Sequence, residues 1–381
     1  MKFALFSKRQ SKKKDPKKER IKLRLPLAVK IIYAIAAVCL LVYVAFLLSE
    51  SFADFFNRYV SSAVRAILAH LTNWIPFSLA EFFLLLIPIW IILISRAVLK
   101  RYGDTLSETL SAAVCVLSAI ALIFSTFTFG FAPAYRGSTL DKKLGIQRTE
   151  VSADELYETS MILVEKLKEE VGNVSYGEDG FSIMPYGKAQ MNDKLLDAFD
   201  TASDKYTFIQ KLNSRIKPVM LSKAMSYTHI TGVYTFFTGE ANINVDFPDY
   251  TLPYTAAHEL SHQRGIARED EANFVAYLVC SASEDSYIRY TAYLGLYEYV
   301  ASALMQADSD LYMRSYSSLP LCVKDELAAY SRFFEPYVDS TASEVSETVN
   351  NTFLTIHGTE GTKSYGMVVD LAVAYYKPQI N

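Results

Sequence analysis

Cysteine is scarce in this chain, with four residues among 381. Cys39 and Cys115 lie in apolar runs, where a thiol serves as a small apolar side chain. Cys280 and Cys322 lack the spacing of a cysteine metal site, which argues against a cysteine-ligated centre and leaves open whether these two pair. The net charge is also small, at -3, so the chain as a whole attracts no particular class of partner.

Histidine is rare as well, with five residues, yet two of them stand four apart in His258-Glu259-Leu260-Ser261-His262. Positions i and i+4 share one face of a helix, so His258 and His262 can present two imidazole nitrogens to one Zn2+ ion. Glu259 stands between them, where its carboxylate can take a proton from water at the ion. The spacing predicts zinc-dependent hydrolysis with Glu259 as the catalytic base. The alternative is a histidine pair that only makes hydrogen bonds inside a core.

A zinc site of this kind needs a third protein ligand. Gly265 predicts the end of the first helix, and residues 268–282 read as a second helix. Glu271 begins an otherwise apolar stripe on that helix, which should face the core and the metal. We therefore expect Glu271 to be the third ligand, with Asp270 or Asn273 orienting a ligand from the outer shell. The stripe continues through Val275, Leu278, Val279 and Ala282.

The segment before the metal helix is rich in β-branched and aromatic residues. Its strand-like runs at 232–237 and 241–245, punctuated by glycine, predict a small sheet or hairpin. His229 and Tyr234 are candidates for oxyanion or substrate contacts, because donors aimed at developing charge serve this role in hydrolases. Glu240 reads as either a cleft acid or a turn residue.

The first part of the chain predicts a membrane protein. Half of all residues are hydrophobic (51%), and the mean hydropathy is positive. Residues 1–26 form a basic tail, for which anionic lipids are a better partner than nucleic acid, given the apolar run that follows. Three transmembrane helices are expected at about 27–48, 77–99 and 110–131, within a membrane region of residues 27–132.

Two further features concern this membrane region. Pro88 should kink the second span, and residues 49–73 should form an interfacial amphipathic helix. Basic residues on the tail and near 96–104 place both on the cytoplasmic side. The protein is therefore expected in the cell membrane as a multi-pass protein, with residues 133–381 as an extracytoplasmic domain. Helices are expected in this domain at about 152–171, with a capping box, and at 192–202 and 206–214.

The same residues carry a family resemblance. Phe237-Thr238-Gly239-Glu240-Ala241-Asn242, His258 to Gly265 and Ala267 to Phe274 resemble the uncharacterised bacterial membrane family called domain of unknown function 3810. The two histidines and the downstream glutamate also resemble zincin metallopeptidases, although Asn273 stands where many membrane zincins have aspartate. The resemblance implies a mainly α protein, with transmembrane helices followed by a zincin-like α+β domain that has a small sheet.

These observations lead to two hypotheses. The first is a membrane-anchored zinc metallopeptidase that hydrolyses an extracytoplasmic peptide or protein, with Zn2+ on His258, His262 and Glu271. The second is a non-catalytic membrane sensor or assembly factor that keeps a zincin fold. Glu259 favours the enzyme, because a structural metal site needs no base between its two histidines.

Overall fold

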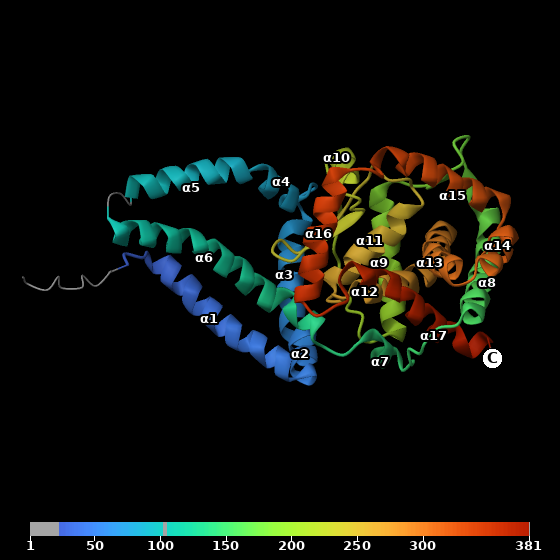
Figure 1. Ribbon diagram of the computed structural model, residues 1–381, viewed down its shortest axis with the longest axis horizontal. Coiled ribbons are helices and arrows are strands. Elements are labelled where there is room, and N and C mark those ends of the chain that lie inside the picture. The colour runs from blue at the N-terminus through green and yellow to red at the C-terminus, as the bar shows by residue number, and fades with distance from the viewer. Residues whose placement is uncertain (1–22, 102–104, 381) are drawn as a thin grey trace, which may run out of the picture.

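The computed structural model describes residues 23–101 and 105–380, so most of the predicted basic tail lies outside the described residues. The protein is mainly helical. Long apolar helices extend from one side of a helical body that carries two small sheets (Figure 1). The apolar helices spread apart toward the body, and the candidate site is in the body (Figure 1).

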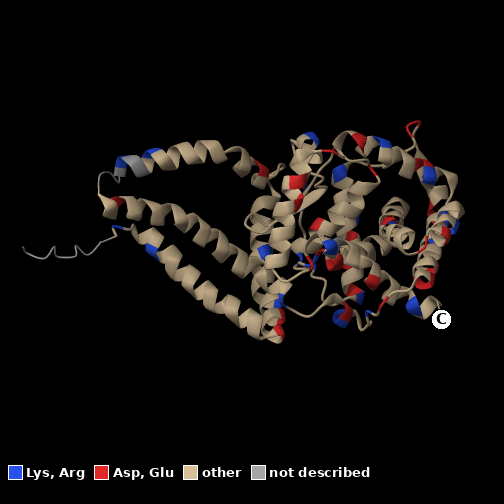
Figure 2. Ribbon diagram, viewed as in Figure 1, with Lys and Arg blue, Asp and Glu red and all other residues tan. Residues whose placement is uncertain are grey.

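Two single helices are long and apolar enough to cross a membrane, namely α1 (Leu27–Leu48) and α6 (Leu106–Gly130). Between them, α4 (Leu79–Leu85) and α5 (Ile87–Arg101) form a pair bent by 56°, which is either one broken span or a re-entrant loop. The break falls at Leu86, where the ring of Pro88 disfavours a continuous helix, as the sequence predicted. The apolar helices carry most of their charged residues near their ends (Figure 2).

The predicted amphipathic segment at 49–73 is helical throughout. It consists of α2 (Glu50–Phe55), the π-helix η1 (Phe56–Ser61) and α3 (Ser62–Asn73). The π-helical stretch was not predicted. α3 runs across the direction of the apolar helices, at their junction with the body (Figure 1).

Helices build most of the body, and α11, α12 and α13 form its centre. The centre contributes many of the side chains of the main hydrophobic core. The helices of the body are η2 (Ala132–Tyr135), α7 (Leu140–Leu144), α8 (Ala153–Glu170), η3 (Val171–Asn173), α9 (Lys188–Lys205), α10 (Ser222–Ser226), α11 (Thr251–Gln263), α12 (Glu269–Ser281), α13 (Ser286–Ala307), α14 (Ser309–Ser318), α15 (Leu321–Phe334), η4 (Glu335–Tyr337), α16 (Thr341–Ile356), η5 (Gly361–Met367) and α17 (Val368–Ile380).

The strands form two small sheets. β1 (Ser175–Tyr176) pairs antiparallel with β2 (Ser182–Ile183). β3 (Ile216–Pro218), β4 (Gly232–Thr235) and β5 (Glu240–Ile243) form the second sheet in the order β3-β5-β4. β3 is parallel to β5 and β4 is antiparallel to it, so the small sheet with a hairpin that was predicted before α11 is confirmed.

Two predictions about the body can be checked directly. The capping box at the start of α8 is confirmed, because Ser152 and Glu155 each bind the other's backbone amide. The prediction of a helix at 206–214 is wrong, because this segment is an irregular connection between α9 and β3. Ile209 in this connection is buried in the core, so the apolar pattern reflected packing without a helix.

A buried ion pair between two strands of the second sheet is also linked to the start of α4. The Nζ atom of Lys217 binds the Glu240 carboxylate, and both side chains are almost fully buried. The same carboxylate accepts hydrogen bonds from the backbone amides of Leu79 and Ala80 at the start of α4. Glu240 is therefore neither a cleft acid nor a turn residue. It holds the beginning of α4 against the sheet.

Replacing Lys217 with Met should destabilise the protein strongly. Removal of one partner leaves a buried charge uncompensated, which costs about 3–5 kcal/mol. Lys211→Met is the matched control, because Lys211 and its partner Asp204 are exposed and such a pair contributes about 0–1 kcal/mol. Thermal unfolding of the detergent-purified chain measures both. Equal shifts in the two variants would contradict this assignment.

Candidate metal centre

The site begins with the helix that carries the motif. α11 places His258 and His262 one turn apart, with their rings 4.6 Å apart between centroids. Gly265 ends this helix in a left-handed conformation, at φ 86°, as the sequence predicted. The amides of Gly265 and Ile266 donate to the carbonyls of His262 and Ser261, which is the hydrogen-bond pattern of a Schellman motif.

This turn also orients one histidine. The Nδ1 atom of His262 lies 2.7 Å from the carbonyl oxygen of Ile266. A carbonyl can only accept a hydrogen bond, so Nδ1 carries a proton, and Nε2 is the nitrogen that has a lone pair when the ring is neutral. Metal-binding histidines commonly have such a partner on the second nitrogen. The turn thus orients the His262 ring, so that a metal ion could bind it only through Nε2.

Glu269 lies opposite the two histidines. Its Oε2 atom is 3.2 Å from Nε2 of His258 and 3.3 Å from Nε2 of His262. Ligand atoms of these three residues all lie within 4.8 Å of one another. Two imidazole nitrogens and one carboxylate oxygen therefore converge on a single point.

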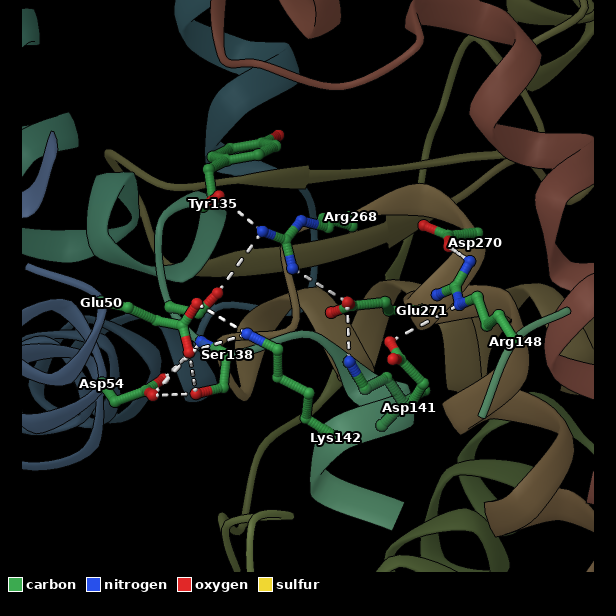
Figure 3. A network of polar contacts seen from close by, with 12 residues as sticks. Glu50, Asp54, Tyr135, Ser138, Asp141, Lys142, Arg148, Arg268, Asp270 and Glu271 are labelled. Atoms are coloured by element: carbon green, nitrogen blue, oxygen red, sulfur yellow. Dashed lines mark hydrogen bonds and ion pairs between the residues drawn. The ribbon is translucent and has the colours of Figure 1, made fainter. Parts of the chain in front are cut away.

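Glu271 does not belong to this group, which corrects the expected third ligand. Its Oε1 atom accepts hydrogen bonds from the amide of Leu140, at 2.9 Å, and from Nη1 of Arg268, at 3.0 Å. Asp270 pairs with Arg148 at 2.7 Å, so it does not serve the histidines as an outer-shell partner either. Figure 3 shows both acids within a polar network that holds the connector after α6 against α12.

The reason for this difference is the environment of α12. The sequence argument assumed that only the apolar stripe of this helix faces inward. In the structure every residue from Glu269 to Cys280 is buried. A helix buried on all sides has no single inward face, so its apolar stripe could not identify the residue that points at α11.

Glu259 lies next to the group and is almost fully buried. Its Oε2 atom has no hydrogen-bond partner among the described residues. Gly232 in β4 packs directly against it, because a Cβ atom added at Gly232 would lie only 2.5 Å from Oε1. The backbone amide of Tyr234 also lies near enough to lower the pKa of this carboxyl group slightly. One edge of the sheet therefore holds the Glu259 side chain in place.

Burial and charge shift the pKa values of these groups. Burial raises the pKa of Glu259 to about 7, against the lowering effect of both histidines. Burial alone would lower the pKa of His262, but the Glu269 carboxylate outweighs it and raises that pKa to about 9. Burial likewise opposes ionisation of Glu269, yet the two imidazoles lower its pKa. A negative carboxylate is therefore stable in the centre of the group.

A cavity of about 450 Å³ opens beside the group, and His258 and Glu259 line it. His229 and Asn273 line it too, whereas Tyr234 does not. The ring of Tyr234 packs on Phe131 at 5.2 Å, and its hydroxyl has no partner in the described part of the chain. The Tyr234 side chain therefore packs outside the cavity, and the structure does not support the expected substrate contact there.

His229 and Asn273 differ in how they are held. His229 has a positive φ of 59°, and its Nε2 atom lies 2.7 Å from the carbonyl oxygen of Tyr337. Nε2 therefore donates to Tyr337, and this hydrogen bond holds the ring at the wall of the cavity. Asn273 lies one turn after Glu269, and its backbone carbonyl accepts a hydrogen bond from Tyr254.

Sequence reasoning missed three residues of the site. Glu269 was one of three consecutive acids, and no periodicity distinguished it. Tyr254 and Tyr299 line the cavity, and burial raises the pKa of Tyr299 to about 12. With 26 tyrosines in the chain, no sequence signal marked these two.

Comparison with protein-family models matches residues 52–373 to the family described as Protein of unknown function (DUF3810). The comparisons with curated proteins and with solved structures found no match.

Proposed function

Because this chain belongs to the DUF3810 family, whose function is unknown, we propose a function from the site itself: a membrane-anchored, zinc-dependent metallopeptidase. One observation carries the proposal. His258, His262 and Glu269 bring three ligand atoms within 4.8 Å of one another, next to a buried carboxylate on Glu259. Two histidines on one helix and an acid from the next would suit a zincin-like hydrolytic site, and this supports the proposal.

The donor set suits zinc. Two imidazole nitrogens and one carboxylate oxygen are the ligands of a catalytic zinc site, which keeps one position open. His262 would bind through Nε2, because its Nδ1 proton is committed to Ile266. Glu269 would supply the oxygen between the two rings. When bound, Zn2+ would act as a Lewis acid that polarises a carbonyl and makes water more acidic.

The residues of the chain would perform the remaining steps. Glu259 would accept a proton from the attacking water and deliver it to the leaving amine. Its free Oε2 atom and its support by β4 suit this role, because proton transfer needs a fixed carboxylate. Tyr299 lies in the wall of the cavity, where its hydroxyl could donate to the developing oxyanion.

β4 is the candidate edge for an extended peptide. It lies at the end of the strand order β3-β5-β4, so no other described strand pairs with its outer side. Thr231 and Gly232, at its beginning, line the cavity beside Glu259. A peptide backbone added along such an edge gains main-chain hydrogen bonds, and this would place a peptide bond near the metal group.

The arrangement of the apolar helices supports an extracytoplasmic site. The described start of α1 and the end of α5 lie on one side, and the body lies on the other (Figure 1). Lys30 and Arg96 lie toward the first side. The positive-inside rule assigns such ends to the cytoplasm, so we propose that the body faces outward.

Metal analysis of the full-length protein tests this proposal. After mild washing with chelator, purified wild type should retain about one zinc per chain, and His262→Ala should retain almost none. The wild-type protein should also cleave members of a peptide library, with the products identified by mass spectrometry. Zinc without cleavage would leave the second hypothesis, a membrane sensor or assembly factor. A folded wild type without zinc would contradict the metal site.

A further inference from the structure

α16 forms the wall of the cavity opposite the metal helix. Ser343, Ser346, Glu347 and Asn350 of α16 line the cavity. Farther along the helix, Leu354 is buried in a hydrophobic cluster with residues of α1 and α6. The face of α16 toward the body is thus mostly polar, although a helix packed on a protein usually turns its apolar face inward.

The apolar side chains of α16 lie elsewhere. Val345, Val349 and Ile356 are 61%, 64% and 67% exposed, and Phe353 is also partly exposed. These four residues follow one another at intervals of four, four and three, so they form one stripe along the helix. A continuous exposed apolar stripe of this kind marks an interaction surface.

Contacts at one end of α16 show which way the stripe points. Phe353 lies 6.1 Å from Phe127 of α6 and 6.3 Å from Tyr135, between ring centroids. His357, directly after the helix, lies 4.7 Å from Phe127. The stripe therefore meets the body end of a membrane-crossing candidate. Along the long axis of the molecule, α16 lies between the apolar helices and α11, and it runs across their direction (Figure 1).

A second exposed apolar surface lies, like α16, where the apolar helices meet the body. α3 also runs across the apolar helices at their junction with the body (Figure 1). Its exposed residues Ile67, Leu71 and Trp74 lie at intervals of four and three, and Trp74 is 78% exposed. Phe237, in the turn between β4 and β5, is exposed too. Tryptophan is enriched where a membrane meets water, so these residues fit the boundary of a bilayer.

We propose that α16 lies on the surface of the bilayer crossed by the apolar helices, with its stripe among the lipids. An amphipathic helix in this position lies in the plane of the interface, with its apolar face about 5–10 Å deep. The opposite, polar side of α16 then closes the cavity of the metal group. The lipid contact does not depend on the proposed peptidase activity. If the proposed peptidase activity holds, the cavity receives peptides that are presented close to the membrane.

Fluorescence quenching by lipids tests this contact in the full-length protein. Single cysteines at Val345 or Val349 carry an environment-sensitive dye, in a variant with the four native cysteines replaced by alanine. Glu344→Cys and Thr348→Cys are the matched controls, since both neighbours are exposed on another side of the same helix. Each protein is placed in nanodiscs of neutral phospholipid, without or with spin labels on the acyl chains. Circular dichroism first shows that each variant is folded.

Dyes at 345 and 349 should be quenched several-fold more strongly than dyes at 344 and 348. Equal, weak quenching at all four positions would overturn the proposal. A blue-shifted emission at 349 that resists lipid quenching and increases with protein concentration would also overturn it, because a second copy of the chain would then cover the stripe. Neutral lipid separates this contact from the attraction of anionic lipid to the basic tail.

Discussion

Glu269→Gln should abolish zinc binding at the proposed site, and Glu271→Gln should not. The change at Glu269 takes away the only carboxylate in the described group of three ligands. Loss of an outer-shell partner already weakens metal binding about 10–100-fold, so loss of a ligand should exceed about 100-fold. Competition with a fluorescent zinc chelator measures the affinity, and metal analysis gives the zinc content of each variant.

Glu271→Gln is the matched control for this experiment. It lies two residues farther along the same helix and is equally buried, but its carboxylate binds Arg268 and the amide of Leu140. The variant should keep its zinc and lose stability, because hydrogen bonds to charged groups contribute about 1.5–3 kcal/mol. The opposite pattern, with zinc lost only in Glu271→Gln, would restore the ligand expected from the sequence.

Glu259→Gln should abolish peptide cleavage while the protein keeps its zinc. The amide has the shape of the carboxylate, so it should fit against Gly232, but it cannot accept a proton from water. General base catalysis contributes about 10²–10⁴-fold, so the rate should fall by that factor. Cleavage of the peptide library, measured at equal zinc content, gives the result.

Two controls make the Glu259 experiment decisive. Glu344→Gln removes an exposed carboxylate from α16 and should cleave like wild type. His258→Ala should lose zinc and cleavage together. If Glu259→Gln with its zinc retained cleaved at the wild-type rate, the peptidase proposal would fail and a binding role for the metal domain would remain.

α11 and α12 show most clearly which features local sequence rules predict and which depend on how helices pack. Histidines four residues apart define a ligand pair on any helix, and Gly265 marks the end of that helix, so local rules were sufficient there. The choice among Glu269, Asp270 and Glu271 was different. Consecutive helical residues point about 100° apart, so the direction that faces α11 depends on how the two helices pack.

The wall of the cavity gives a second example. Tyr299 and Asn350 lie far from the motif in sequence, and each stands in a helical pattern that is also compatible with simple packing. A polar helix face like that of α16 also occurs on the solvent side of an ordinary amphipathic helix. In the fold, α16 lies between the apolar helices and α11 (Figure 1), and its polar residues line the cavity beside the histidines.

By itself, the sequence determined the local features of this protein. These are the apolar runs, the break before Pro88, the capping box of α8, the β4–β5 hairpin and the histidine pair with its central glutamate. Each depends on neighbouring residues and on the period of a helix or strand. The tertiary structure alone decided that Glu269 completes the group and that Asp270 and Glu271 hold the connector after α6. These outcomes depend on contacts between distant segments, which the pattern along a single helix does not contain.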